Sequence, residues 1–318
     1  MTEVFYLTLP IFILILLGLF AVGAGLVSKT GIAAMGKFVV TFALPAMLFR
    51  ALSERSITEI FKLEFLSAYA AGSVVAMAIG FSLAKFWRGK SLQESTFHGM
   101  GGAMSNSGFM GYPIVFQLFG TPGAVAVALA MIVENVVILP VTLMLAEAGS
   151  AGKRHPMLVL SRALRRLLTS PLILAIAAGL LCAGFGLTLP SFVTRAVDLL
   201  AAAAAPVALF VVGGILYGQR VRGMVADVVS IATVKLVAHP LVIFLALMIV
   251  PPFDPVLQSA ALILACMPMA SIFPLLGKMY GYESVCSGAL VVATAVSFAS
   301  ISVVIWMVGA IGPAAAGG

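Results

Sequence analysis

Two short stretches combine helix-breaking residues with polar side chains inside apolar sequence. The first, SNSGFMGYP (105–113), contains Asn106, Ser107, Gly108, Gly111 and Pro113. The second, ACMPMASIFPLLG (265–277), contains Pro268, Ser271 and Pro274. Proline suits the first turn of a helix, and Asn or Ser can partner exposed backbone groups nearby. Each half-helix that follows would then direct its N-terminal amides and positive dipole end at an anionic ligand. We therefore expect these residues to bind a substrate and to have no catalytic role.

Three ionisable side chains, those of Glu134, Lys235 and His239, also interrupt apolar sequence. Lys235 and His239 lie one helical turn apart, so they share a helix face. Charges within a membrane span usually face the protein interior and mark a path for substrate or ions. Lys235 would attract a carboxylate, and Glu134 or His239 would carry a coupling proton. The alternative is structural: a Glu134–Lys235 ion pair that holds the bundle together, or a Lys235 that reaches the inner surface.

The composition places these residues in a membrane protein. The hydrophobic share is 62%, the charged share is 9% and the mean hydropathy is +1.19, whereas soluble domains carry about 25% charged residues. A span of a hydrocarbon core of about 30 Å needs about 20 apolar residues, and ten segments reach that length. They are residues 4–27, 33–52, 65–86, 97–119, 122–146, 171–189, 196–217, 226–250, 256–278 and 285–311.

The basic residues collect in alternate loops. With the N-terminus outside, the inner loops hold 13 Lys and Arg residues and the outer loops hold 4, while Lys235 lies within a span. Cytoplasmic loops carry the basic excess, so we predict a multi-pass protein of the cytoplasmic (inner) membrane with both termini outside. This topology explains the net charge of +7 without a nucleic-acid partner. The three cysteines show neither metal-ligand nor disulfide spacing, and we expect no metal and no cofactor.

An internal repeat relates the two polar breaks. Pro10 and Pro171, Pro45 and Pro206, and Pro113 and Pro274 are each separated by 161 positions, and the same shift aligns ALPAMLF (43–49) with AAPVALF (204–210). The repeat predicts two halves of five spans, residues 1–150 and 171–318, joined by a cytoplasmic connection at 151–170. An odd number of spans inverts the second half relative to the first. Broken helices at equivalent places in inverted halves indicate a substrate site at the bilayer midplane. A single break would more often be a kink or a close-packing site, because Gly and Pro are common in membrane helices; the matched pair favours the site.

The motifs FALPAMLFRAL in the second span, NSGFMGYP in the fourth and KLVAHP in the eighth resemble the auxin efflux carrier family. The resemblance covers essentially the whole chain, and the family contains bacterial malonate-type permeases and plant PIN-formed auxin exporters. It implies an all-α fold of the bile-acid and sodium/proton antiporter type, with crossing broken fourth and ninth helices. Spans one, two, six and seven would form a scaffold and the others a mobile transport unit. A homodimer through the scaffold spans would fit this arrangement. At Ser271 the chain departs from relatives that place an amide there.

These observations together predict a secondary transporter that moves small organic anions, mono- or dicarboxylates, by alternating access, with proton or sodium coupling left open. An enzyme is not expected, because the spans contain neither a protease-like serine motif nor a pair of aspartates. Two alternatives remain: a cation/proton antiporter on the same fold, which would need paired acidic residues near the crossover, and a membrane sensor that binds a ligand without moving it.

Overall fold

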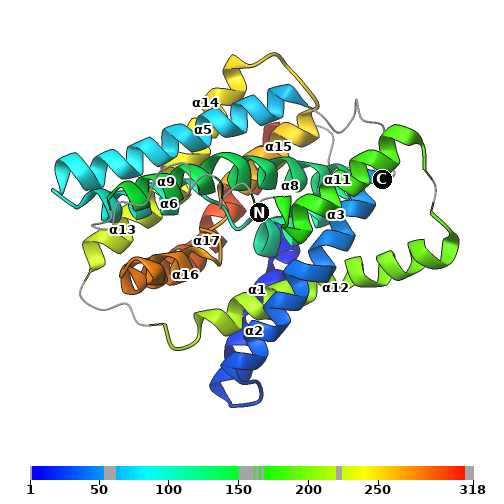
Figure 1. The fold of residues 1–318 in the computed structure, drawn as a ribbon, viewed down its shortest axis with the longest axis horizontal. Helices are drawn as coiled ribbons and strands as arrows, with labels where there is room; N and C mark the ends of the chain where they lie inside the picture. The colour runs from blue at the N-terminus through cyan, green and yellow to red at the C-terminus, as the bar shows by residue number, and fades with distance from the viewer. Residues whose placement is uncertain are drawn as a thin grey trace.

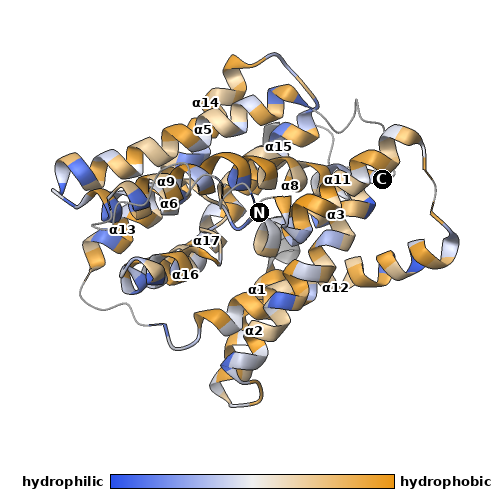
Figure 2. Cartoon of the chain, viewed as in Figure 1, coloured by the Kyte–Doolittle hydropathy of each residue, from blue (hydrophilic) through white to orange (hydrophobic). Residues whose placement is uncertain are grey.

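The computed structural model describes residues 2–53, 62–149, 161, 165, 168–187, 189–219 and 224–311, and it is built from helices (Figure 1). Six helices are long and apolar enough to cross a membrane: Lys29–Ser53, Leu63–Trp87, Thr121–Ala148, Ser191–Leu216, Val225–Ile249 and Glu283–Met307. Shorter apolar helices are Leu9–Gly23, Pro171–Phe185 and Pro255–Ala265. Hydrophobic residues cover the lengths of the helices, and hydrophilic ones gather near their ends (Figure 2). The chain therefore has the helices of a multi-pass membrane protein. Ten crossings and an inverted repeat remain predictions.

Every predicted span contains helix. In the first half the helices are α1 (Thr2–Gly23), α2 (Lys29–Phe38), α3 (Leu44–Ser53), α5 (Leu63–Ser82), α6 (Leu92–Ala103), α7 (Tyr112–Phe119), α8 (Thr121–Val133) and α9 (Leu139–Ala148). In the second half they are α11 (Pro171–Phe185), α12 (Ser191–Leu216), α13 (Val225–Thr233), α14 (His239–Ile249), α15 (Pro255–Ala265), α16 (Phe273–Met279) and α17 (Glu283–Ile311). Of the 151–170 connection, residues 151–160, 162–164 and 166–167 lie outside the described part of the chain.

Wider π-helical turns join several of these helices: η1 (Val39–Ala43), η2 (Leu83–Trp87), η3 (Ser107–Gly111), η4 (Glu134–Ile138) and η5 (Val234–Ala238). Four of the five are followed two residues later by a proline, at positions 45, 113, 140 and 240. Proline has no N–H, and its ring pushes away the carbonyl four residues earlier. The residue before each proline accordingly bonds to the carbonyl five residues back, as Leu139 N does to Glu134 O. Turns of this kind are often found at functional sites. Here they carry Ser107, Glu134 and Lys235.

The helices pack in two groups, each of which takes helices from both halves of the sequence (Figure 1). In the support group, α12 packs against α1, α2 and α3, and α11 packs against α3. In the crossover group, α5 packs against α6 and α14, α8 against α7 and α15, and α17 against α13 and α16. The support group matches the scaffold implied by the family resemblance. The seam between the groups is formed mainly where α3 and α12 meet α7, α8 and η3.

Backbone contact between α1 and α12 holds the support group together. A Cβ atom at Gly18 would collide with the carbonyl oxygen of Phe210, and one at Gly213 would collide with that of Ile15. Glycine at these two positions lets the helices approach at backbone distance, which is a common way to associate helices within a membrane.

Candidate functional site

The two polar breaks cross and pair with one another. Helix α6 ends at Ala103 and α15 at Ala265, and the segments that follow meet as a short antiparallel bridge between Ser105 and Met269. Asn106 N donates to Pro268 O at 2.8 Å, and Ala270 N donates to Met104 O at 3.2 Å. Each break thus satisfies backbone groups of the other, which non-helical backbone at membrane depth requires. The two broken segments therefore pair directly with each other, as a crossing of these segments requires.

Asn106 connects this crossing to the helix that follows. Its carbonyl accepts hydrogen bonds from Met110 N and Gly111 N, and its side-chain Nδ2 donates to Ser271 Oγ at 3.0 Å. The turn η3 and helix α7 then run away from the crossing, so their first amides face it. The positive end of this half-helix therefore points at the place where the two breaks meet. Helix α16 after the second break has only seven residues, and we assign its N-terminus no binding role.

Lys235 lies behind the crossing, where it is completely buried. Its Nζ is 2.7 Å from Ser105 Oγ, 2.8 Å from Ala265 O and 2.7 Å from His239 Nδ1. An ammonium has three donors and no acceptor, so these three partners use all of them. His239 Nδ1 must then accept, and the proton on its Nε2 donates to Ser73 Oγ at 3.0 Å. Lys235 thus ties both breaks and α5 to its own helix and does not reach the inner surface.

Glu134 contacts the first break at Ser107 and is also buried. Its Oε1 accepts from Ser107 Oγ at 2.6 Å and from Tyr69 OH at 3.4 Å. Within the described residues, Glu134 and Lys235 form no direct ion pair. The hydroxyls of Tyr69 and Ser105, 3.4 Å apart, connect the two charged groups instead. The simple ion-pair alternative considered from sequence is therefore wrong in its geometry.

A cavity of about 390 Å³ opens beside the crossing, on the seam between the two helix groups. Its polar wall includes Ser105, Asn106, Ser107, Glu134, Asn135 and Ser271, and its apolar wall includes Val40, Leu44, Phe109 and Met131. The cavity extends along Leu139–Leu143 to Thr169–Leu172, where α11 begins. Sites for small molecules usually fall between about 300 and 1,000 Å³ and combine apolar walls with a few convergent polar groups. The cavity has this character.

The charges around the cavity are unusual for an anion site. Its described lining residues include no Lys or Arg, and Glu134 is the single acidic residue among them. Positive potential comes from the first amides of η3 and, one layer behind Ser105, from Lys235. An anion placed there would meet backbone dipoles directly and the lysine indirectly, so the protonation of Glu134 would strongly affect its binding.

Some of the predicted site residues line the cavity, and the others lie behind its wall. Asn106, Ser107, Gly108, Ser271 and Glu134 line the cavity. The others lie behind the wall: a Cβ at Gly111 would contact Leu264, Pro268 supplies a carbonyl to the crossing, and Pro113 and Pro274 begin helices. Lys235 and His239 also lie behind it.

Sequence reasoning missed Ser73, Tyr69, Ser105 and Asn135. A usable signal existed for two of them, because Tyr69 and Ser73 lie four residues apart on one face of an otherwise apolar span. Ser105 was within the quoted motif, but its bond to Lys235 depends on the fold.

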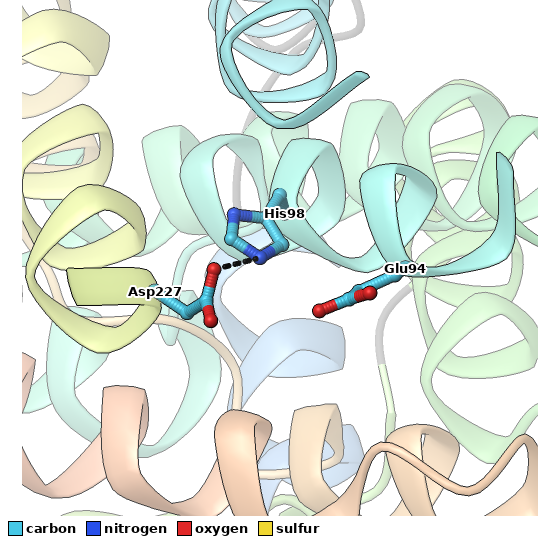
Figure 3. A group of neighbouring side chains, drawn as sticks. All are labelled: Glu94, His98 and Asp227. Carbon is cyan, nitrogen blue, oxygen red and sulfur yellow. Dashed lines mark ion pairs between the residues drawn. The ribbon is translucent and has the colours of Figure 1, made fainter. Parts of the chain in front are cut away.

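A second polar cluster ties α6 to α13 at the far end of the crossover group (Figure 3). His98 and Asp227 face each other at 3.4 Å, and Glu94 lies beside them. Two carboxylates and an imidazole could hold a metal ion. Lys90 Nζ already bridges Glu94 at 2.7 Å and Asp227 at 3.1 Å, and Arg88 lies 3.0 Å from Asp227. The hydrogen bond to Glu94 raises the pKa of Lys90 above its ordinary value. The cluster is an ion-pair network with its own cations.

Comparison with known proteins identifies relatives among membrane transporters. Residues 3–307 match the family described as "Membrane transport protein". The chain is 32% identical over 312 residues to a candidate malonate transporter of Rhizobium meliloti (strain 1021), with 97% of each chain covered. It is 24% identical over 238 residues to an uncharacterized transporter of Methanothermobacter thermautotrophicus, covering 73% of this chain and 74% of that one.

Proposed function

The chain belongs to the membrane transport protein family, the auxin efflux carrier family indicated by its motifs, and on that premise we propose that it is a secondary transporter of small organic anions. The observation that carries the proposal is the cavity walled by Asn106, Ser107, Glu134 and Ser271 where the two broken helices cross. Broken backbone at membrane depth is found where it lines a cavity or is covered by protein, and in transporters such half-helices surround the substrate.

The substrate class follows from the donors that the wall offers. The amides at the start of η3, the second N–H of the Asn106 side chain and the Ser271 hydroxyl can donate to carboxylate oxygens, whereas the Ser107 hydroxyl already donates to Glu134. The volume of about 390 Å³ suits a small mono- or dicarboxylate. The name of the Rhizobium relative makes malonate the first compound to test. A cation/proton antiporter is less well supported. It would need paired acidic residues, and Glu134 is the single acidic residue among the described lining residues of the cavity.

Alternating access would come from movement of the crossover group against the support group. The cavity lies on the seam between them and extends to the start of α11, directly after the connection that the basic residues place in the cytoplasm. With both termini outside the cytoplasmic membrane, this structure would represent the state open to the inside. A shift of α7 and α8 along α3 and α12 would close that side.

Glu134 is the proposed coupling group. An ionised carboxylate and a substrate anion in the same buried cavity repel each other, and a proton on Glu134 removes that repulsion. Ser107 and Tyr69 bond to Oε1, so a proton on Oε2 would leave both contacts in place. The carrier would then move a proton with the anion. Lys235 would remain a fixed positive charge behind Ser105.

Uptake and counterflow in proteoliposomes test the function, with labelled malonate, succinate and acetate and with imposed pH and sodium gradients. Asn106→Ala leaves Ser271 without its donor and removes a ligand contact. A loss of about 1–3 kcal/mol, or roughly 5- to 150-fold in substrate affinity, is expected. Gln258→Ala is the matched control, because that amide bonds to Phe253 O at the end of α15 away from the cavity. An unchanged affinity in Asn106→Ala would remove the crossing from the binding site. Binding of a carboxylate without flux would identify a sensor.

A further inference from the structure

A second, smaller hollow lies on the same seam, further along α3 and α8. Its volume is about 230 Å³, and its wall includes Met47 and Arg50 of α3, Tyr112 and Phe116 of α7, Thr121 of α8 and Asp198 of α12. Both helix groups contribute, as they do to the larger cavity. The two hollows lie toward opposite ends of the continuous helix 121–148, because one contacts Thr121 and the other reaches Leu143.

On α3 and on the segment after the first break, residues that line the two hollows lie about one helical turn apart. Leu44 lines the larger one and Met47 the smaller one, so along α3 they are one helical turn, or about 5 Å, apart. On the helix after the first break, Ser107 and Gly108 face the larger hollow while Tyr112 and Phe116 face the smaller one. The smaller hollow therefore continues the line of the larger one toward the side that the topology places outside.

The smaller hollow has the cationic side chain that the larger one lacks. Arg50 Nη1 lies 2.9 Å from Asp198 Oδ1, with the two side chains 46% and 36% exposed. The other described residues that line this hollow are uncharged. A guanidinium binds a carboxylate through two parallel N–H groups. The Asp198 carboxylate is the same chemical group as that of an organic-acid substrate. The pair thus resembles an anion site occupied by the protein's own side chain.

We propose that the hollow at Arg50 is the outward-facing binding station for the substrate carboxylate, and that Asp198 occupies the Arg50 guanidinium until an external anion displaces it. The inference rests on the proposed function, and it adds a second site with its own residues. Arg50 and Asp198 both belong to the support group, whereas Tyr112, Phe116 and Thr121 belong to the crossover group. Movement of the crossover group would uncover the pair without breaking it. Substrate then exchanges with Asp198.

Substitutions of Arg50 and Asp198 should change half-saturation by external malonate in opposite directions. Asp198→Asn removes the competing carboxylate and its repulsion, so the external malonate concentration for half-maximal uptake should fall several-fold. Arg50→Gln should raise it by about tenfold or more, and Arg50→Lys should raise it too, because an ammonium cannot make the two-point contact. In Arg50→Gln with Asp198→Asn, the benefit of Asp198→Asn should disappear, which is the signature of coupled residues. Arg195→Gln, an exposed arginine of α12 outside the hollow, is the control and should change nothing.

Sidedness separates a binding station from a structural ion pair. Labelled malonate flux is measured in right-side-out and inside-out membrane vesicles, together with the thermal stability of each purified variant. The proposal requires that half-saturation from the outside changes while half-saturation from the inside stays within twofold. Equal changes on both sides, or an effect of Arg195→Gln as large as that of Arg50→Gln, would overturn it. Wild-type flux with unchanged external half-saturation in all variants would reject this station alone. Absence of any carboxylate flux in the wild type would reject the proposed function and the station together.

Discussion

Replacing Lys235 with methionine tests whether the buried ammonium organises the crossing. Methionine has a similar length and no donors, so the variant leaves Ser105 Oγ, Ala265 O and His239 Nδ1 without their shared partner. Hydrogen bonds from a charged group contribute about 1.5–3 kcal/mol each, which gives roughly 4–9 kcal/mol for the three. Relief from burying a charge returns several kcal/mol. We expect a net loss of about 3 kcal/mol in the free energy of unfolding.

Thermal unfolding in detergent with a thiol-reactive dye measures this loss, because Cys266 and Cys286 are buried and react only on unfolding. In a chain of 318 residues, a loss of about 3 kcal/mol corresponds to a fall of roughly 4–5 °C in the midpoint. Lys278→Met is the matched control, since that lysine is exposed and its ion pair with Glu283 is 3.7 Å long; exposed pairs contribute at most about 1 kcal/mol. If Lys235→Met is as stable as Lys278→Met, the three-acceptor reasoning is refuted.

Two further changes probe coupling and the support group. Glu134→Gln should keep counterflow, because the amide oxygen can still accept from Ser107 and Tyr69, but it should abolish the response of uptake to an imposed pH gradient; a wild-type response would make Glu134 structural. Gly213→Ala should lower the unfolding midpoint in the same thiol assay by an amount that corresponds to about 1–3 kcal/mol, because the new methyl collides with the Ile15 carbonyl. Gly36→Ala, which meets only a Val211 methyl at 3.3 Å, should be neutral, and equal losses in both variants would contradict the close-contact argument.

Much of the helical layout could be predicted from the sequence because hydropathy and proline carry it. Apolar length gave ten helical segments, and each contains helix. The breaks at 104–106 and 266–272 were expected from their composition. Their direct pairing could not be read from spacing, because the bridge joins Ser105 to Met269, 164 positions apart, whereas the repeat shift is 161. The register of the pairing depends on which backbone carbonyls and amides lack a partner within their own helices. The fold determines which groups these are.

The prolines gave a signal that the sequence reasoning used only in part. It treated Pro113 and Pro274 as helix starts, and the structure agrees. Pro140 and Pro240 were not considered, yet each widens the helix just before it and so positions Glu134 and Lys235. Pro140 lies six residues after Glu134, and Pro240 lies five residues after Lys235. The cause of the widened turn is the same in both cases, because proline lacks an N–H and its ring clashes with the carbonyl four residues earlier. The sequence reasoning therefore found the charged residues but could not say where they would point.

The internal repeat predicts the position of the proposed site but not its chemistry. Shifting Glu134 by 161 positions leads to Ala295, and shifting Lys235 back leads to Val74. Both of these positions are exposed on the outside of the helix bundle, where a charge would face lipid. Each half thus supplies one charged group, and the hydroxyls of Ser105 and Tyr69 connect the two. Under the proposed function, the Lys235 ammonium behind Ser105 and the protonatable Glu134 carboxylate beside Ser107 would give a bound anion one preferred orientation.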